Sequence, residues 1–336
     1  MSDALWWTAE DARRVTADPT WAEALLDVPA LVVDLRDDQE VGEPAPLRHA
    51  SCPVIALVPG GAETSWPVDL VLAAGSPDAA LLGGSLEEAA SILTDRAAAN
   101  PTAAATLARL LRLTPALEVG DALEVESVAY SMLLAGEEFR RWLAERPAPR
   151  PPADAEADAV RTDRQGGTLH VTLNRPQVHN AFNAAMRDAL VEACAVAIAD
   201  WSVGTVVIDG NGPTFCSGGD LAEFGTTDDP ARAHLVRTAR SVGASMHRLR
   251  DRLTVRVHGS CIGAGVELPA FARRVVAATG TTFRLPEVGM GLIPGAGGTV
   301  SLPRRVGSAR TLLLALSGLE IGADEALRWG LVDTVE

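Results

Sequence analysis

The stretch GSCIGAGVEL, Gly259–Leu268, decides the fold because it joins an apolar strand, expected at 254–258, to a helix through a turn of small residues. A second turn of this kind, FCSGGD at Phe215–Asp220, follows an expected strand at 205–208. Small residues let the backbone approach a neighbouring group closely, and the first N–H groups of a helix are unpaired. The two turns together are suited to holding an anion, although glycine-rich turns with a purely structural purpose are commoner.

Strand and helix patterns alternate around these turns. Residues 169–173 read as a strand and residues 184–199 as a helix, and both precede the strand at 205–208. This alternation favours an α/β domain with parallel strands.

Composition excludes several classes of chemistry. The 336 residues contain no lysine, so all 29 basic side chains are arginine. Schiff-base and pyridoxal-phosphate mechanisms, and the phosphate-binding loop that depends on a lysine, are therefore excluded. Any contact with a phosphate must come from arginine, histidine or backbone N–H groups.

Charge is distributed unevenly along the chain. The net charge is −15, and residues 1–152 hold 24 acidic and 11 basic side chains, whereas residues 153–336 hold 20 and 18. An acidic first half would repel a polyanion, which argues against nucleic acid as a partner. The nearly neutral second half leaves room for a phosphorylated small molecule.

Cysteine spacing and hydropathy indicate a cytoplasmic protein. The four cysteines, Cys52, Cys194, Cys216 and Cys261, form no CxxC pair and have no histidine at metal-ligand spacing, so we expect neither a disulfide framework nor a metal site. No apolar run approaches the roughly 20 residues of a membrane span, and the acidic N-terminus does not resemble a signal peptide.

Four regions are expected along the chain. Residues 147–165 are rich in proline and acidic residues and are typical of a linker. Upstream, residues 86–146 carry helical spacing and residues 1–85 carry short apolar runs at 30–35, 53–58 and 68–74 that suggest a small α/β region. Residues 166–336 form the remaining region, which contains both glycine-rich turns.

Five separated motifs of this last region resemble the crotonase superfamily of enoyl-CoA hydratases and isomerases. The motifs, in order, are LNRPQVHNAFN at 173–183, FCSGGDL at 215–221, GSCIGAGVEL at 259–268, FRLPEVGMGLIPGAGGT at 283–299 and ALRWGLVD at 326–333. The resemblance implies a crotonase-like spiral of ββα repeats, preceded here by a small α/β and helical N-terminal region. It also implies an enzyme of fatty acid metabolism that binds an acyl-CoA thioester and stabilises its enolate.

The resemblance implies an oxyanion hole formed by the backbone N–H groups of Gly219 and Ala264. Each such donor contributes on the order of 3 kcal/mol where charge develops. Ala264 is expected to begin a helix, whose dipole would act in the same direction. Most relatives have glycine at this position, but a backbone donor requires no particular side chain.

The resemblance also assigns the two catalytic acids. Glu267 would deprotonate the water that attacks C3 of the enoyl group, and Glu287 would protonate C2. A carboxyl that donates a proton near neutral pH needs its pKa raised by an apolar pocket or by a neighbouring carboxylate.

Other residues match the segments with which the family binds coenzyme A. They are Arg175, His179, Ser217, Gly218, Asp220 and Gly263. Among them, Asp220 also fits a structural role in anchoring its loop. No metal or other cofactor is expected, coenzyme A being part of the substrate, and the family implies a homo-oligomer, a trimer or a dimer of trimers.

Faint internal similarity links the two halves of the chain. ALVVDLRDD at 30–38 resembles TVVIDGNGP at 205–213, and residues 51–77 resemble residues 252–281. We predict that residues 1–85 are a shortened copy of the catalytic core without its acids. From the resemblance we expect the core to lack the family's usual C-terminal helices, and residues 86–146 to cover the site instead.

The function expected from these residues is hydration of a 2-enoyl-CoA. The same oxyanion hole also serves isomerases, lyases and, in some N-terminally extended relatives, cofactor-independent dioxygenases that act on aryl-acetyl-CoA. A non-catalytic subunit of a hetero-oligomer is the alternative from a different class.

Overall fold

The computed structural model describes residues 5–37, 44–62, 64–147 and 158–336. The strands are β1 Leu5–Thr8, β2 Leu31–Asp34, β3 Val54–Val58, β4 Leu70–Ala73, β5 Val160–Gln165, β6 Thr168–Leu173, β7 Thr205–Gly210, β8 Leu253–Val257, β9 Ser260–Ile262, β10 Arg274–Ala277, β11 Thr282–Arg284, β12 Glu320–Gly322 and β13 Thr334–Val335. The α-helices are α1 Ala9–Thr16, α2 Pro77–Ala80, α3 Leu86–Ala99, α4 Pro101–Leu113, α5 Val119–Leu134, α6 Glu137–Glu145, α7 Ala184–Ala199, α8 Pro230–Ala239, α9 Val242–Arg248, α10 Ala264–Glu267, α11 Gly298–Ser301, α12 Pro303–Val306, α13 Ser308–Ser317 and α14 Ala323–Trp329.

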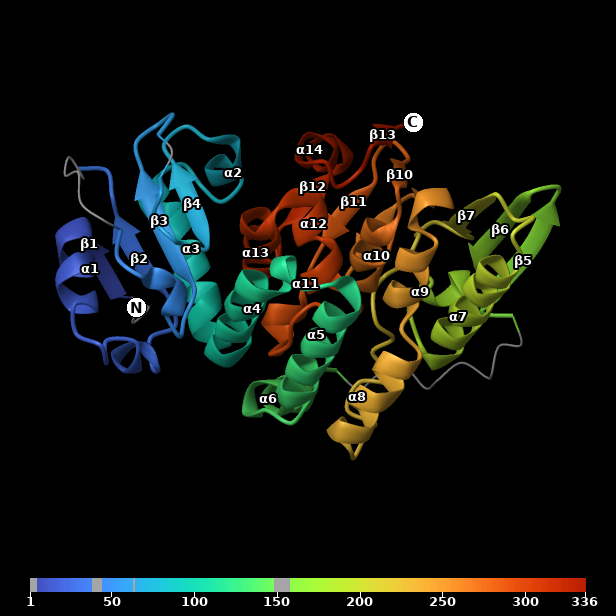
Figure 1. Ribbon diagram of the computed structural model, residues 1–336, viewed down its shortest axis with the longest axis horizontal. Helices are drawn as coiled ribbons and strands as arrows, with labels where there is room; N and C mark the ends of the chain where they lie inside the picture. The colour runs from blue at the N-terminus through green and yellow to red at the C-terminus, as the bar shows by residue number, and fades with distance from the viewer. Residues whose placement is uncertain (1–4, 38–43, 63, 148–157) are drawn as a thin grey trace.

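Three sheets organise the described residues. A four-stranded parallel sheet has the order β1-β2-β3-β4, a six-stranded sheet has the order β13-β10-β8-β7-β6-β5, and a three-stranded sheet has the order β12-β11-β9. Within the six-stranded sheet only β5 is antiparallel to its neighbour. Figure 1 shows the four-stranded sheet at one end of the molecule and the six-stranded sheet at the other, with α4, α5, α11 and α13 between them.

Strand register brings the glycine-rich turns together. Cys216 forms an isolated parallel bridge with Cys261, and Cys261 in turn pairs with Phe283 across β9 and β11. Each of these three residues is followed within four positions by a turn. Because the strands run parallel and in register, the turns at Gly219, Ala264 and Glu287 emerge at the same edge.

The two halves of the chain share one apolar core. Alternate residues of the four-stranded sheet point to opposite faces, as the period of a strand requires. One face, including Val32 and Leu57, joins the main core, while the other face, including Val33 and Ala56, packs in a separate cluster with Trp7 and Trp21. The N-terminal sheet is therefore covered on both faces.

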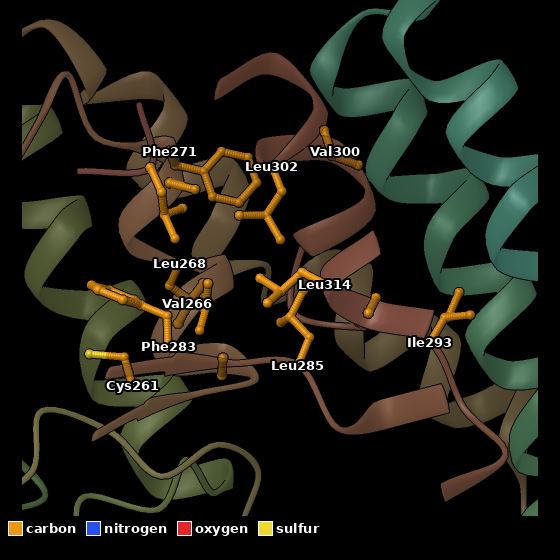
Figure 2. Packing of buried hydrophobic residues seen from close by; sticks show 14 of the residues in the cluster. Cys261, Val266, Leu268, Phe271, Phe283, Leu285, Ile293, Val300, Leu302 and Leu314 are labelled. Atoms are coloured by element: carbon orange, nitrogen blue, oxygen red, sulfur yellow. The ribbon is translucent and has the colours of Figure 1, made fainter. Parts of the chain in front are cut away.

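Helix α13 links the N-terminal half to the catalytic region. It contacts α3, α4 and β4 on one side and the short helix that contains Glu287 on the other. Leu314 of α13 is buried with Val266 and Leu302 in the main core, and Figure 2 shows this cluster with Val300 beside the helices of the N-terminal half.

Several sequence expectations can be compared directly with the elements. The helix expected at 184–199 is α7, and the helical region 86–146 contains α3 to α6. Expected linker residues 160–165 instead form β5, because they pair residue by residue with β6. The rest of that linker includes residues 148–157, which lie outside the described residues.

Residues 1–85 contain more structure than the sequence patterns indicated. The apolar runs form β2, β3 and β4, but β1 and α1 were not anticipated. Both halves contain strands that are consecutive in the sequence and are parallel neighbours in a sheet. This arrangement is compatible with a common origin. Among the described residues of this half, no strands form a second sheet like that of β9, β11 and β12, so the shortened copy stays a prediction.

Candidate active site

Two backbone amides at the turns lack acceptors. Neither the N–H of Gly219 nor that of Ala264 has a hydrogen-bond acceptor among the described residues, although Gly263 N–H donates to Arg284 and Ile262 N–H donates to Cys216. The turns are in contact: a Cβ at Gly263 would lie 3.6 Å from the Cα of Gly218. Two unpaired donors on touching turns are the arrangement that stabilises a developing oxyanion.

Helix α10 contributes less than the sequence suggested. Ala264 does begin this helix, but the helix ends at Glu267 and is only four residues long, with Pro269 starting a separate 3₁₀ turn. The dipole of a helix grows from aligned peptide units, so four residues add little to the field at Ala264. The effect expected at this position comes from the unpaired N–H itself.

Glu267 is held by the loop that follows Pro294. Its side chain is 2% exposed, and Oε2 accepts hydrogen bonds from the N–H groups of Ala296 at 2.7 Å and Gly298 at 2.9 Å. The absence of a side chain at Gly298 permits this contact, since a Cβ there would lie 2.7 Å from the same oxygen. One carboxylate oxygen of Glu267 is therefore fixed by the backbone.

Glu287 lies at the neighbouring turn. Its Oε2 is buried and has no hydrogen-bond partner among the described residues. A Cβ at Gly263 would come within 2.4 Å of Glu287 Oε1, which places this carboxyl against the turn that presents Ala264. A buried and unpartnered carboxyl oxygen is costly unless the group is protonated or meets a ligand.

Burial raises the pKa of both glutamates, and for Glu267 neighbouring carboxylates raise it further. Burial, with the charges of Glu287 and Glu126, raises the pKa of Glu267 well above its ordinary value. Burial likewise raises the pKa of Glu287 to about 7, against the opposing effects of its hydrogen bond to its own backbone and the charge of Arg284. Two buried carboxyls with raised pKa values favour holding a proton near neutral pH.

A third carboxyl comes from the N-terminal half. Glu126 of α5 is 2% exposed and accepts hydrogen bonds from the N–H groups of Gly297 at 2.8 Å and Thr299 at 2.9 Å. Sequence reasoning missed it because an isolated glutamate in a helix usually faces solvent. Glu126 lies four residues from both Ala122 and Tyr130, which are on the packed face of α5. This helical spacing is the sequence signal that could have identified it.

Aromatic side chains pack against glycines at the candidate site. The ring of Tyr130 lies against Gly295, where a Cβ would be 2.3 Å from Tyr130 Cδ2, and the Arg237 guanidinium lies 4.6 Å from the ring centroid. Phe224 covers Gly219 and packs against Phe139 of α6 with ring centroids 6.3 Å apart. Helices α5 and α6 therefore pack against segments that flank the predicted site residues, while the expectation that residues 86–146 cover the site stays a prediction.

Arg175 and Asp220 hold each other rather than an exposed phosphate. The Arg175 side chain is 5% exposed, pairs with Asp220 at 3.0 Å and donates to the carbonyl oxygen of Ala181. Asp220 also accepts from the N–H of Ala222 at 3.0 Å. Because the guanidinium is buried, the structure favours an anchoring role for both residues over the predicted contact of Arg175 with coenzyme A.

The other predicted binding residues lie on the same surface of the turns. His179 is exposed, has a left-handed backbone at φ 55°, and its carbonyl accepts from Ser217 N–H at 3.0 Å. The carbonyl of Gly218 accepts from Phe182 N–H at 2.7 Å. The structure thus brings Ser217, Gly218 and Gly263 beside the proposed oxyanion hole and ties His179 to them.

The described residues contain neither a cluster suited to a metal ion nor a helix suited to span a membrane. Within 5–37, 44–62, 64–147 and 158–336, no cluster of three or more histidine, cysteine, aspartate or glutamate residues is placed to hold a metal ion. In the same residues, no helix has both the length and the apolar character needed to cross a membrane.

Comparison with known proteins assigns the family. A family model described as enoyl-CoA hydratase/isomerase matches residues 163–336, which is about half of the chain. The chain belongs to the enoyl-CoA hydratase/isomerase family. This confirms the resemblance found in the motifs.

Individual members of the family show the extent of the similarity. The chain is 39% identical over 172 residues to 2,3-dehydroadipyl-CoA hydratase of Escherichia coli K12, covering 51% of this chain and 67% of the relative. It is 34% identical to the trans-2-decenoyl-acyl-carrier-protein isomerase of Streptococcus mutans, covering 49% and 65%. The chain therefore spans about two thirds of the length of these curated relatives.

A solved structure supports the same fold. Enoyl-CoA hydratase from Bacillus anthracis superposes with a TM-score of 0.50 at 28% identity, covering 53% of this chain and 70% of that one. The crotonase fold expected for residues 166–336 is confirmed, and the N-terminal half lies outside the family match.

Proposed function

We propose that this protein adds water to a 2-enoyl-CoA thioester. The observation that carries the proposal is the pair of acceptor-free amides at Gly219 and Ala264, on touching turns, beside the buried carboxyls of Glu267 and Glu287. The family contains hydratases and isomerases, and the two acids support hydration.

The thioester carbonyl would bind between the two amides. As a nucleophile adds at C3, negative charge builds on the carbonyl oxygen, and fixed N–H donors stabilise it without having to reorganise. Removing one such donor costs roughly 3 kcal/mol in comparable sites. The surrounding apolar side chains strengthen these bonds because they exclude water.

The two glutamates divide the proton transfers. Burial and neighbouring carboxylates raise the pKa of Glu267, whereas the N–H groups of Ala296 and Gly298 oppose this by stabilising its ionised form, in which it would remove a proton from the attacking water. Glu287, whose buried oxygen has no partner among the described residues, would carry the shared proton and deliver it to C2. Water then provides the hydroxyl at C3 and, through Glu267, replaces the proton that is lost from Glu287.

Isomerisation is the second candidate function. It needs one carboxyl to move a proton between two carbons of the same substrate, and Glu287 has the unpartnered oxygen for this task. The similarity to an isomerase of Streptococcus mutans supports this alternative. Formation of the shifted double bond, without incorporation of water, would distinguish it from hydration.

The remaining features of the proposal come from the family. An acyl-CoA is the substrate, no metal or further cofactor takes part, and the protein works in the cytoplasm as a homo-oligomer, a trimer or dimer of trimers. Ser217, Gly218 and Gly263 are proposed to contact coenzyme A, with His179 beside them. Light scattering of the purified protein measures the oligomeric state.

Hydration of crotonyl-CoA and of longer and aromatic enoyl-CoAs, followed by the loss of enoyl thioester absorbance, tests the function. Glu267→Gln and Glu287→Gln should each reduce kcat by about 10²- to 10⁴-fold, as expected for the loss of a general acid or base. Glu320→Gln changes an exposed glutamate on β12 and should retain full activity. No turnover by the wild-type protein, or turnover at the wild-type rate in both active-site variants, would contradict the proposal.

A further inference from the structure

We infer that Glu126, supplied by α5 of the N-terminal half, is a positioning residue that holds the Ala296–Thr299 loop in the conformation that binds Glu267. The inference rests on the proposed function. The family match begins at residue 163, so it assigns no role to Glu126.

Two glutamates share the four N–H groups of this loop. Glu267 Oε2 accepts from Ala296 and Gly298, whereas Glu126 accepts from the two residues that alternate with them, Gly297 and Thr299. The loop is thus bound from one side by the proposed base and from the other side by a residue of α5. Successive N–H groups of residues 296–299 therefore donate alternately to the two carboxyls, so a displacement of this segment would change contacts to both.

Further contacts fix Glu126 and the loop. Thr299 Oγ1 donates to Glu126 Oε2 at 2.7 Å, and Thr114 Oγ1 donates to the carbonyl of Thr299 at 2.6 Å. The ring of Tyr130, one helical turn beyond Glu126, lies on Gly295 at the start of the loop. The N-terminal half therefore contacts this segment at Gly295, Gly297 and Thr299.

Charge also connects Glu126 with Glu267. Burial raises the pKa of Glu126 to about 7, although its hydrogen bonds and the charge of Arg237 act in the opposite direction. The charge of Glu126 helps to raise the pKa of Glu267, which faces Glu287 as well. Tyr130 of α5, Arg237 of α8 and Cys216 also interact with these carboxyls.

A purely structural Glu126 would affect only stability. A positioning residue would change how well Glu267 removes a proton, and therefore kcat and the pH dependence of kcat/KM. Two substitutions separate its two contributions. Glu126→Gln keeps one carbonyl acceptor but removes the charge, whereas Glu126→Ala removes the anchor of the loop.

The experiment measures crotonyl-CoA hydration by the full chain as a function of pH. Glu126→Ala should lower kcat by roughly 10-fold or more with a smaller change in KM, because misplaced catalytic groups mainly slow the chemical step. Glu126→Gln should shift the acidic limb of kcat/KM to lower pH by about one unit, since removing a negative charge favours ionisation of Glu267.

Glu138 provides the matched control. It is a second buried glutamate of the N-terminal helices, and it accepts the N–H groups of Thr102 and Ala103 without contacting the 296–299 loop. Glu138→Gln and Glu138→Ala should lower the melting temperature but leave the pH profile unchanged. If both Glu126 variants fold and match these controls in kcat and in the position of the acidic limb, the inference is overturned.

A measurement without turnover keeps the inference separate from the proposed function. Infrared difference spectra recorded across pH follow the C=O bands of protonated buried carboxyls. The band that is missing in Glu267→Gln belongs to Glu267. The band of Glu267 should titrate at lower pH in Glu126→Gln than in the wild-type protein. An unchanged band overturns the inference, whereas absent hydration by the wild-type protein overturns only the function on which it rests.

Discussion

The carboxyl of Glu287 occupies the space that any side chain at position 263 would need. Gly263 has φ 50° and ψ −117°, and a Cβ there would lie 2.4 Å from Glu287 Oε1. Gly263→Ala would therefore strain the backbone by about 1–3 kcal/mol and displace Glu287. We expect a roughly 100-fold loss of hydration in addition to a lower melting temperature.

Gly280 supplies the control for Gly263. It also has a positive φ, 82°, but a Cβ would meet no atom within 4 Å. Gly280→Ala should therefore show the backbone cost alone, with kcat unchanged. Equal kcat in the two alanine variants would show that Glu287 does not depend on the empty space at Gly263.

The raised pKa of Glu126 predicts how stability changes with pH. Because its pKa in the folded protein is about 7 and its ordinary value is 4.5, the folded state binds more protons between these values. The resulting stabilisation of the folded state, on the order of 3 kcal/mol, is fully present below pH 4.5 and is lost as the pH rises through 7. Glu126→Gln should therefore lose less stability than the wild-type protein from pH 4.5 to 8, measured by urea unfolding. Parallel curves would contradict this prediction.

Individual residues of the candidate site could be predicted from the sequence where they lie within a motif. Gly219, Ala264, Glu267 and Glu287 were named from their motifs, and the structure brings them to one place, although their roles stay predictions. Glu126 could not be predicted in this way, because the partners of this residue are 171 and 173 positions away. The burial of Arg175 likewise could not be predicted from the sequence, because it depends on packing against Asp220.

The first turn of helix α4 donates hydrogen bonds to a side chain of helix α6. Glu138 of α6 accepts the N–H groups of Thr102 and Ala103, which lie in the first turn of α4 and have no partner within the helix. Glu138→Ala would leave both N–H groups without this acceptor, and that of Ala103 is buried. We expect a loss of roughly 1–3 kcal/mol in the free energy of unfolding, measured by urea denaturation.

The adjacent residue makes this a matched comparison. Glu137 is exposed and pairs only with Arg140, whose side chain is also exposed. Surface pairs of this kind contribute about 0–1 kcal/mol, so Glu137→Ala should change stability little. A similar loss in both variants would mean that Glu138 does not stabilise α4 through its two hydrogen bonds.

Elements were predicted best where the sequence has a clear period. Helix α7 was expected within its observed bounds, and β3 was expected from an uninterrupted apolar run. Strand β5 was missed because its burial pattern is almost entirely exposed and its only strand partner is β6. A strand stabilised by an edge pairing carries little apolar signal in its own residues.

The arrangement of the halves could not be derived from local patterns. Charge and composition separated residues 1–152 from the rest, which suggested parts with different roles. The structure instead places Leu93 and Leu107 of the N-terminal helices in the same core as Leu313 and Val255. The apolar periodicity of an amphipathic helix indicates that one face is buried, but it does not indicate which element packs against that face.

A shared core predicts that the two halves unfold together. The joint between them includes buried contacts of α13 with α3 and α4, and the hydrogen bond from Thr114 to Thr299. Heating the protein in a scanning calorimeter should give one transition whose calorimetric and van't Hoff enthalpies agree for each folded chain. The separate cluster around Trp7 and Trp21 shares the four-stranded sheet with the main core, so it should melt in the same transition. Two resolved transitions, with hydratase activity surviving the first, would show that the N-terminal half stabilises neither the core nor the position of Glu267.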